Sequence, residues 1–405
     1  MRNSRRNTEL VELGRMKVLV IHPRMGVFGG GERVVVHSII TALRARHEVL
    51  LASEVFDIPS FEDFFGCQGL FKQVRMLSYP SFRPIADRAV LYQRLLYHQW
   101  HIRGVVTRAK DFDLILSTQD VAYLPSATAP VIQYCYFPEY FVHLESRPSS
   151  LLWKAYYWPA MLFYRNRISD IDCLLSTSNF TQGFVRDKWR RESTTLYPPC
   201  PIDLYKNNNS QREDLVITVG RVVPEKRMNL FLDLAQRLPK VKFAIIGSVA
   251  PDRESYFRRL QEIAPMNVSF LMSPLRKMRD VLGKAKIYVH CARNEHFGIS
   301  IVEAMAAGCV PVVHDSGGPR EIVTDEVGYR WKLLDEAVEV ISELIADDGL
   351  RRKMSTAAVS RAEIFGPETF ESALADVIRR YETLLHDEAW GLGKANTNAN
   401  SKAQL

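Results

Sequence analysis

Cysteine is scarce in this sequence, and its spacing excludes two common structural uses of the residue. The chain has 6 cysteines in 405 residues, each standing alone, with no C-x-x-C pair. Several lie in apolar, strand-like runs, such as Cys173 in "CLLSTS" and Cys291 in "IYVHCA". Isolated cysteines of this kind are typical of reduced core residues, so we expect a cytosolic protein with neither a disulfide framework nor a zinc site.

Long apolar runs are also missing. No stretch of about 18 or more apolar residues occurs, and the opening "MRNSRRNTELVELGRMK" lacks the apolar core of a signal peptide. We therefore expect no membrane-spanning helix. With 405 residues, 47% hydrophobic and 24% charged, the chain has an ordinary globular composition and a length that suits two domains.

Acidic residues are nearly absent from two segments rich in aromatic and basic side chains. Residues 72–110 contain eight Lys or Arg and one acid, Asp87, an excess of +7 that equals the net charge of the whole chain. Residues 147–167 contain four basic residues and no acid. Basic residues mixed with aromatics favour an anionic membrane surface over nucleic acid as the partner. Two surface helices with solvated charges are the alternative.

Short β-branched runs alternate with amphipathic stretches in the first half of the chain. The runs that predict buried strands are residues 17–22, 48–53, 114–118, 130–137 and 173–178. Strands that alternate with helices in this way are typical of βαβ units with right-handed crossovers. We therefore expect a parallel sheet covered by helices.

The same pattern restarts after a polar, Asn-rich stretch. The second set of predicted strands is residues 215–220, 241–247, 268–272, 287–292 and 310–315. The sequence therefore predicts an α/β protein with two Rossmann-like parallel-sheet domains. In such sheets ligands bind at the carboxyl ends of the strands, so a ligand between two facing sheets could touch both domains.

These patterns divide the chain into six segments. The expected segments are an N-terminal extension (1–15), a first domain (16–204), a linker (205–214), a second domain (215–365), a C-terminal helix (366–390) and a tail (391–405). The C-terminal helix could pack back on the first domain. The tail is polar and rich in Gly and Asn, which predicts disorder.

One apolar run near the end of the second domain contains two glutamates. The run reads "NEHFGISIVEAMAAGCVPVVHDSGG" and covers residues 294–318. A strand that ends near Arg293 should be followed by a loop and by a helix that begins at Gly298 or Ile299 and ends at Gly308. Backbone N–H groups at such a helix start have no intrahelical partners and favour an anion or a polar ligand.

The two glutamates would occupy different places in that unit. Glu295 should lie in the loop and Glu303 about one turn into the helix. A carboxylate among apolar side chains is costly to bury without hydrogen-bond partners, which suggests that Glu303 binds a ligand. The alternative is structural, because Ser300 and Glu303 also match a capping box.

Two further stretches carry candidate phosphate-binding groups. After the first strand of the second domain, "VGRVVPEKRMN" places Arg221 and Lys226 beside a strand end and its turn glycine, Gly220. Two cations converging on a cleft can neutralise a diphosphate without a metal, although a pair of ordinary surface cations is the alternative.

The other stretch follows the first strand of the chain. Three glycines, Gly29, Gly30 and Gly31, stand where the strand turns into a helix. Their spacing fails the G-x-G-x-x-G dinucleotide fingerprint, and the lysine of a P-loop is missing. They still offer N–H groups without side chains for close approach by phosphate or sugar. A glycine turn with no ligand is the alternative.

Together these stretches resemble the retaining glycosyltransferases of the GT-B group, family 4 type. The motif sequences are most similar to those of the α-1,2-mannosyltransferases that act on dolichol-linked oligosaccharide. The matching motifs are a glycine-rich "GGxER"-type loop (30–33), "SNFT" (178–181), "YPPC" (197–200), "GxxxPEK" (220–226), E-x7-E (295–303) and "SGGP" (316–319). They occur in the expected order from about residue 17 to 330. The resemblance implies the GT-B fold, two Rossmann-like domains that face each other across a cleft. It also implies that the first domain (16–204) lies on the acceptor side and that the second domain (215–365) binds the nucleotide-sugar.

The resemblance also implies roles for the site residues. Glu295 would contact the transferred sugar, and Glu303 would bind the ribose hydroxyls. Arg221 and Lys226 would neutralise the diphosphate. Backbone N–H groups of Phe297, Gly298, Ile299 and Ser300 would hold sugar and phosphate, and the loop of Gly29, Gly30 and Gly31 would close over the diphosphate.

One position departs from the pattern of these relatives. Many carry a histidine in a "CHFP"-like segment near the sugar, whereas this chain reads "QYCYFPEY" with Tyr136 in that place. Tyrosine can donate a hydrogen bond but is not cationic at neutral pH. His143, seven residues further on, could substitute for it.

The implied function is transfer of a hexose from GDP- or UDP-hexose to a hydroxyl of a glycan or lipid-linked oligosaccharide. Mannose is the expected hexose. No cofactor and no metal are expected, since no D-x-D-like segment follows a strand end. The partners would be the nucleotide-sugar donor, a glycan or polyprenyl-linked acceptor and an anionic membrane surface, without nucleic acid. The protein would be cytoplasmic and peripheral on the cytoplasmic face of a membrane.

Two alternatives share this architecture. A nucleotide-sugar epimerase would release product without an acceptor, and a non-catalytic nucleotide-sugar-binding protein would bind the donor without turnover. A dehydrogenase is excluded because the glycine fingerprint and its acid about twenty residues on are missing.

Overall fold

The computed structural model describes residues 14–109, 111–126, 129–140, 151–206, 211–272 and 275–389. The chain forms two compact units. Unit 1 contains residues 1–135, 146–175 and 371–405, and unit 2 contains residues 136–145 and 176–370. The expected tail, 391–405, and all but two residues of the expected N-terminal extension lie outside the described residues.

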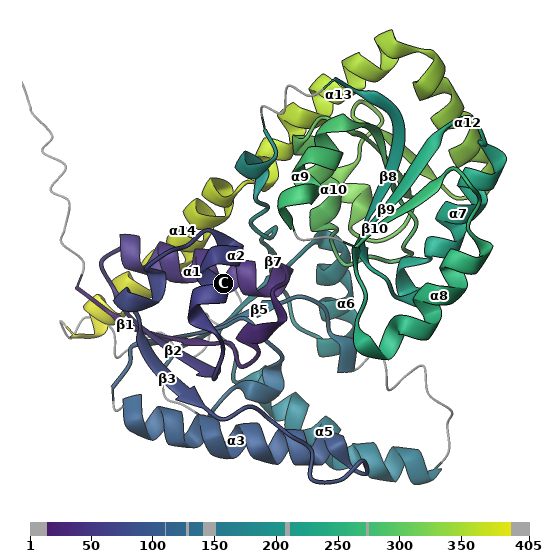
Figure 1. Ribbon diagram of the computed structural model, residues 1–405. Coiled ribbons are helices and arrows are strands. Elements are labelled where there is room, and N and C mark those ends of the chain that lie inside the picture. The colour runs from purple at the N-terminus through teal and green to yellow at the C-terminus, as the bar shows by residue number, and fades with distance from the viewer. Residues whose placement is uncertain are drawn as a thin grey trace, which may run out of the picture. The chain divides into compact units, whose positions relative to one another are not determined.

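The first sheet has seven strands in the order β3-β2-β1-β4-β5-β6-β7 (Figure 1). Its strands are β1 (Lys17–Ile21), β2 (Glu48–Glu54), β3 (Arg75–Tyr79), β4 (Leu114–Ser117), β5 (Val131–Cys135), β6 (Cys173–Ser176) and β7 (Thr194–Thr195). The pairings from β3 through β5 are parallel. Residues 18–21 of β1 are fully buried, as expected for a strand in a sheet that helices cover on both faces.

The second sheet has six strands in the order β10-β9-β8-β11-β12-β13. Its strands are β8 (Glu213–Arg221), β9 (Lys242–Ser248), β10 (Val268–Met272), β11 (Ala285–His290), β12 (Val310–His314) and β13 (Tyr329–Trp331). All its pairings are parallel. Both sheets thus have the nucleotide-binding strand order, in which the chain direction across the sheet reverses next to the first strand.

Helices connect these strands. In unit 1 they are α1 (Gly30–Arg44), α2 (Ile58–Phe65), α3 (Val90–Ala109) and α5 (Leu151–Ser169). In unit 2 they are α6 (Asn179–Trp189), α7 (Met228–Arg237), α8 (Glu254–Ile263), α9 (Leu275–Lys284), α10 (Ile299–Ala306), α11 (Pro319–Ile322), α12 (Leu334–Ala346) and α13 (Asp348–Ala362). In the described part of the chain, no helix combines the length and the apolar character needed to cross a bilayer.

The last helix, α14 (Pro367–Ala389), belongs to unit 1 from Glu371 onward and lies beside α1. Glu371 accepts a hydrogen bond from the His37 ring at 2.7 Å and pairs with Arg44. One turn past the end of α1, the His47 ring lies 2.6 Å from the carboxylate of Glu382. Two His–Glu contacts, both largely buried, therefore hold this helix on the first sheet's layer.

The predicted fold class, two Rossmann-like parallel-sheet domains, is confirmed. All ten predicted strands are present, although most ends differ by one or two residues. Three strands were not predicted: β3, β7 and β13. Each has five residues or fewer, and none is fully buried, so none shows the continuous apolar run of a central strand.

Candidate active site

The candidate site lies where the strand order of the second sheet reverses. The chain proceeds outward from β8 on one side and from β11 on the other. At such a switch point the loops after the two strands separate and leave a crevice at their carboxyl ends. Arg221 ends β8, and Glu295 stands five residues after the end of β11. The topology therefore brings both predicted loops to one edge of the sheet.

Lys226 and Glu295 form the centre of this site. The ammonium group of Lys226 pairs with Oε2 of Glu295. The same Oε2 lies 3.4 Å from Nε2 of His290, which is only 2% exposed. The lysine stem passes over Gly220, where an added Cβ would sit 3.8 Å from its Cε. Glu295 is thus held between a cation on the β8 loop and a buried imidazole on β11.

This environment shifts the pKa of both buried groups. Burial by itself would raise the pKa of Glu295, but the close contact with the His290 ring and the charge of Lys226 outweigh it and hold that pKa far below its usual value. Burial lowers the pKa of His290, and the neighbouring carboxylate opposes the shift only in part. Glu295 is therefore anionic at neutral pH and can accept hydrogen bonds from sugar hydroxyls.

A pH dependence of stability follows from Glu295. Because the pKa of Glu295 in the folded protein lies below its ordinary value of 4.5, the ionised group contributes stability above pH 4.5. This stability is lost as the pH falls through the window below that value. We expect Glu295→Gln to reduce the acid-induced loss of unfolding free energy in that window. Urea unfolding of both proteins from neutral to acid pH measures this, and parallel curves for the two would contradict it.

Helix α10 begins as the sequence predicts. Gly298 precedes its first residue, Ile299, with a φ of 112°, and no side chain caps the helix start. An added Cβ at Gly298 would lie 2.6 Å from Cδ1 of Ile301. The N–H of Ile301 donates to the carbonyl of Gly298 at 2.9 Å, whereas no side chain caps the N–H groups of Ile299 and Ser300, so these two suit a ligand oxygen.

The capping-box alternative for Ser300 is wrong. Ser300 lies within the helix, and its hydroxyl is 2.8 Å from the hydroxyl of Tyr288 on β11. The Tyr288 hydroxyl is also 3.3 Å from Nδ1 of His290. Ser300, Tyr288 and His290 thus form a buried chain of polar contacts that ends at Glu295. Glu303 is half-buried one turn further along the same helix.

The loop that carries Glu295 is supported by the "SGGP" segment. The N–H of Gly318 donates to the carbonyl of Glu295 at 2.8 Å, and the N–H of Asn294 donates to the Ser316 hydroxyl at 2.9 Å. Gly317 has a φ of 70°, and a Cβ there would lie 2.4 Å from the same Glu295 carbonyl oxygen. The two glycines therefore allow backbone-to-backbone packing that sets the position of Glu295.

A second anchor comes from the "SNFT" and "YPPC" segments. The hydroxyl of Ser178 donates to the carbonyl of His296 at 2.6 Å. Glu321 accepts hydrogen bonds from the N–H groups of Asn179 (2.8 Å) and Phe180 (2.7 Å) at the start of α6, and from the Tyr197 hydroxyl at 3.1 Å. A carboxylate at a helix N-terminus is favourable, so Glu321 ties these motifs to one another.

His296 lies next to the proposed sugar-binding residue and was not singled out from the sequence. Its ring stacks on Phe137 at a centroid distance of 4.0 Å and an angle of 7°. Burial lowers the pKa of His296, which favours the neutral ring. Phe137 directly follows Tyr136, whose carbonyl accepts a hydrogen bond from Thr181 at 3.1 Å. His143 lies outside the described residues.

Phe297 is a core residue, whereas Arg221 is exposed. Phe297 is 4% exposed and packs against Tyr197 and Phe365, with each pair of ring centroids 5.5 Å apart. Only its backbone is thus offered to a ligand. Arg221 forms no ion pair in the part of the chain that the structure describes, so its charge is free to meet a phosphate.

The glycine loop belongs to unit 1 and follows β1. Gly29 precedes α1, and Gly30 and Gly31 form its first turn. Glu32 accepts a hydrogen bond from the N–H of Gly29 at 2.7 Å, and its other oxygen lies 3.3 Å from the buried ring of His22. Burial alone would raise the pKa of Glu32, but the contact with His22 outweighs this effect and lowers the pKa. Glu32 thus connects the glycine loop to the buried ring of His22.

No group of three or more His, Cys, Asp or Glu residues with the arrangement of a metal site occurs among the described residues. The charged groups gathered at the switch point are instead Lys226 and Glu295, with Arg221 on the adjacent strand end.

Part of the chain is similar to a known protein family. Residues 202–361 match the family model of glycosyl transferases group 1. The resemblance to group 1 glycosyltransferases is confirmed. The region that matches the glycosyltransferase model contains Arg221, Lys226, Glu295 and Glu303.

Two curated relatives and one solved structure illustrate the similarity. A GDP-Man:Man(3)GlcNAc(2)-PP-Dol alpha-1,2-mannosyltransferase of Caenorhabditis elegans is 32% identical over 225 residues, 48% of each chain. The alpha-1,3/1,6-mannosyltransferase alg2 of Schizosaccharomyces pombe is 25% identical over 400 residues, 86% of this chain and 76% of the relative. The chain thus aligns with about half the length of the first of these glycosyltransferases.

Among the solved structures with a similar fold is Anabaena HepE in complex with UDP. It superposes with a TM-score of 0.70 at 18% identity and covers 90% of this chain and 100% of its own. At this identity the similarity concerns the fold, which is the GT-B glycosyltransferase fold.

Proposed function

We propose that the protein is a retaining, metal-independent hexosyltransferase. It would transfer mannose from a nucleotide-sugar to a hydroxyl of a lipid-linked oligosaccharide. The observation that carries the proposal is the Lys226–Glu295–His290 cluster at the β8/β11 switch point, beside the uncapped start of α10. This choice of substrates is supported by the relatives that are named for GDP-mannose and a dolichol-diphosphate acceptor.

In this mechanism the difficult step is departure of the nucleoside diphosphate. The bond from sugar C1 to the β-phosphate oxygen breaks as positive charge builds on the ring. The acceptor oxygen bonds to C1 on the same face, and its hydroxyl proton passes to the departing phosphate oxygen. Arg221, Lys226 and the first N–H groups of α10 stabilise the leaving phosphate, which is preorganised electrostatic catalysis. Because Lys226 must then turn toward the phosphate, Glu295 becomes available to a sugar hydroxyl.

Glu303 would bind the two ribose hydroxyls of the donor. A half-buried carboxylate that accepts two hydroxyl hydrogen bonds is satisfied and distinguishes a nucleoside from bare phosphate. The loop of Gly29, Gly30 and Gly31 would close over the diphosphate, with Glu32 holding the loop in place through the N–H of Gly29.

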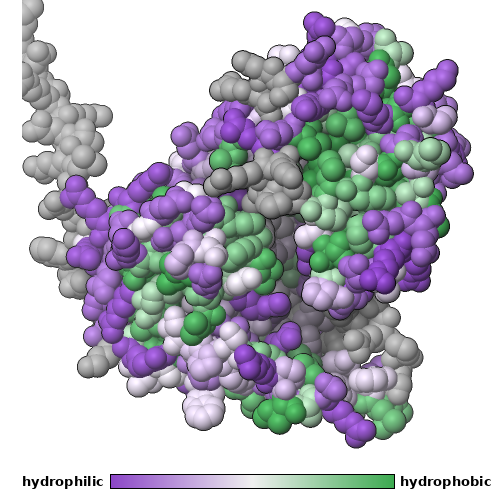
Figure 2. Space-filling model, in the orientation of Figure 1, coloured by the Kyte–Doolittle hydropathy of each residue, from purple (hydrophilic) through white to green (hydrophobic). Residues whose placement is uncertain are grey.

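A peripheral position on the cytoplasmic face of a membrane completes the proposal. Helices α3 and α5 carry exposed apolar side chains, among them Trp100 (77% exposed), Leu152 (83%) and Trp158 (57%). Figure 2 shows hydrophobic and hydrophilic residues side by side along the lower edge of unit 1, where α3 and α5 lie. Aromatic and basic side chains on one surface suit an anionic bilayer.

The donor and the metal requirement can be tested together. We expect GDP-mannose to raise the melting temperature more than UDP-glucose, and transfer to a polyprenyl-linked acceptor to continue in excess EDTA. Complete loss of transfer in EDTA that Mn²⁺ restores would contradict metal independence. Product formation without an acceptor would favour an epimerase, and donor binding without turnover would favour a non-catalytic protein.

A further inference from the structure

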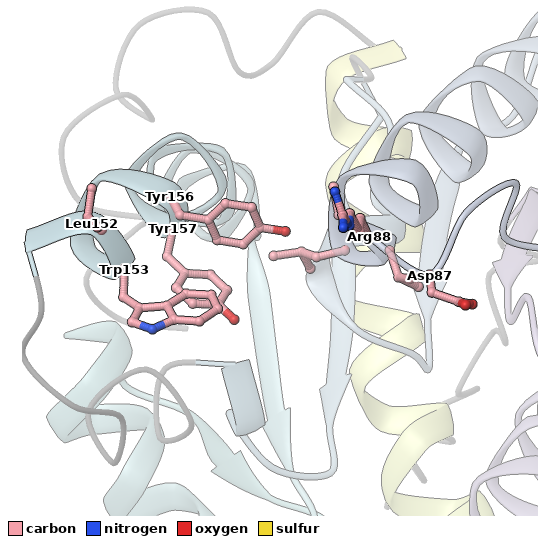
Figure 3. Close-up of a pocket in the computed structure, with 9 residues that line it drawn as sticks. Asp87, Arg88, Leu152, Trp153, Tyr156 and Tyr157 are labelled. Atoms are coloured by element: carbon pink, nitrogen blue, oxygen red, sulfur yellow. The ribbon is translucent and has the colours of Figure 1, made fainter.

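A pocket of about 720 Å³ lies in unit 1. It is formed by the beginning of α3, the segment before it and the beginning of α5 (Figure 3). Its lining residues are Asp87, Arg88, Ala89, Val90, Leu91, Leu152, Trp153, Tyr156 and Tyr157. This volume is within the range of small-molecule sites, about 300–1,000 Å³.

Specific hydrogen bonds build one wall of the pocket. The side chain of Gln93 accepts from the N–H of Ile85 at 2.7 Å and donates to the carbonyls of Ala86 (2.9 Å) and Arg88 (2.7 Å). One glutamine therefore folds the segment before α3 back on the helix. The backbone turn that enters α3 passes through Ala89 at a φ of 53°, an unfavourable conformation for a residue with a side chain.

The two helices are joined directly at the pocket. The hydroxyl of Tyr92 on α3 donates to the backbone carbonyl of Tyr156 on α5, and the two rings are 5.2 Å apart edge to face. Pro159 lies in the next turn of α5 and removes one backbone hydrogen bond from it. This interlock gives the pocket a defined second wall.

That second wall is aromatic, and a cation lies opposite. Trp153 stacks on Tyr157 at 5.7 Å and meets Tyr156 edge to face. In Figure 3 the Tyr156 ring points across the gap toward Arg88, whereas the Asp87 carboxylate turns away from the aromatic side chains. Apolar surface continues from the pocket onto the protein surface, because the lining residue Leu152 and its neighbour Leu151 are more than 80% exposed.

We propose that this pocket binds the first isoprenoid units of a polyprenyl-phosphate or -diphosphate acceptor, with its phosphate at Arg88. The proposal rests on the proposed function, which requires such an acceptor. The aromatic wall and adjoining exposed leucines match a branched hydrocarbon chain that leaves a bilayer. The excess of +7 in residues 72–110, which include Arg88, matches the charge of the lipid phosphate.

Binding of farnesyl phosphate, measured by calorimetry on the full chain below the concentration at which it aggregates, tests the pocket without donor or bilayer. We expect Arg88→Glu and Trp153→Ala each to weaken binding about tenfold or more, as expected for anchor residues. The matched controls on α3 are Arg103→Glu, with the same charge change, and Trp100→Ala, the same truncation. Both positions are exposed and lie outside the pocket lining, so these variants should stay within about twofold.

Three results would overturn the proposal that this pocket binds a polyprenyl phosphate. Equal losses in all four variants would indicate nonspecific charge and apolar attraction. Competition by inorganic phosphate as strong as by farnesyl phosphate would indicate an anion site alone. Competition by dihexanoyl phosphatidic acid of equal strength would indicate a general lipid site. Failure of the proposed function would be a different result, because loss of donor binding or of sugar transfer leaves lipid binding in this assay unchanged.

Discussion

Lys226→Ala should lower the rate of sugar transfer about 100- to 1000-fold, the usual cost of removing one donor that stabilises a leaving oxyanion. The lysine is 24% exposed, pairs with Glu295 and belongs to the loop that follows β8. Its loss would remove positive charge from the departing phosphate and leave Glu295 with His290 as its remaining close partner. The measurement is single-turnover transfer with saturating nucleotide-sugar.

A second lysine of unit 2 provides the matched control. Lys206 is 28% exposed and pairs with Asp203 and Glu363. Lys206→Ala therefore removes ion pairs that involve neither site loop, and it should leave transfer unchanged. Near-normal transfer in Lys226→Ala would favour the alternative that Arg221 and Lys226 are ordinary surface cations.

Glu303→Ala is expected to raise the donor KM, because the ribose hydroxyls lose their proposed acceptor. Its circular dichroism spectrum should stay normal.

Gly317→Ala is expected to have the second largest effect. Its φ of 70° would strain any side-chain-bearing residue, at a cost of about 1–3 kcal/mol. The new methyl group would also lie 2.4 Å from the Glu295 carbonyl oxygen and 2.8 Å from the Glu295 nitrogen. The loop must move to relieve this overlap, and a displacement of about 1 Å at a catalytic group can cost about 100-fold in rate.

Gly183→Ala is the control for this substitution. Gly183 lies inside α6, and an added Cβ would meet nothing within 4 Å. Alanine should therefore stabilise the helix by about 0.5–1 kcal/mol and leave activity intact. Urea unfolding and steady-state transfer rates of both variants separate the two effects. A Gly317→Ala protein with wild-type transfer would show that the "SGGP" segment does not position Glu295.

The central strands and the two loops at the switch point could be predicted from the sequence. Continuous β-branched runs mark strands buried on both faces, and Lys226 and Glu295 follow two such runs directly. Because parallel strands end at one edge of a sheet, their loops had to converge there. The start of α10 could also be predicted from the local sequence, because Gly298 directly precedes an apolar run.

Other parts of the site could not be predicted, because their residues look structural in one dimension. Tyr288 and His290 lie within β11 and read as core residues, yet they connect Ser300 to Glu295. Glu321 resembles an exposed helix acid, and only the fold brings α6 to it. The pocket between α3 and α5 depends on Gln93 and Tyr92, whose hydrogen bonds have no sequence signature.

The attachment of α14 to α1 has a consequence for biosynthesis. Glu371 and Glu382 hold His37 and His47, so unit 1 is assembled from stretches more than 300 positions apart. A ribosome must translate all of unit 2 before these partners exist. Unit 2 can thus finish folding while unit 1 still exposes the layer that α14 will cover. We therefore expect chaperones to bind mainly to unit 1, whose synthesis begins first and ends last.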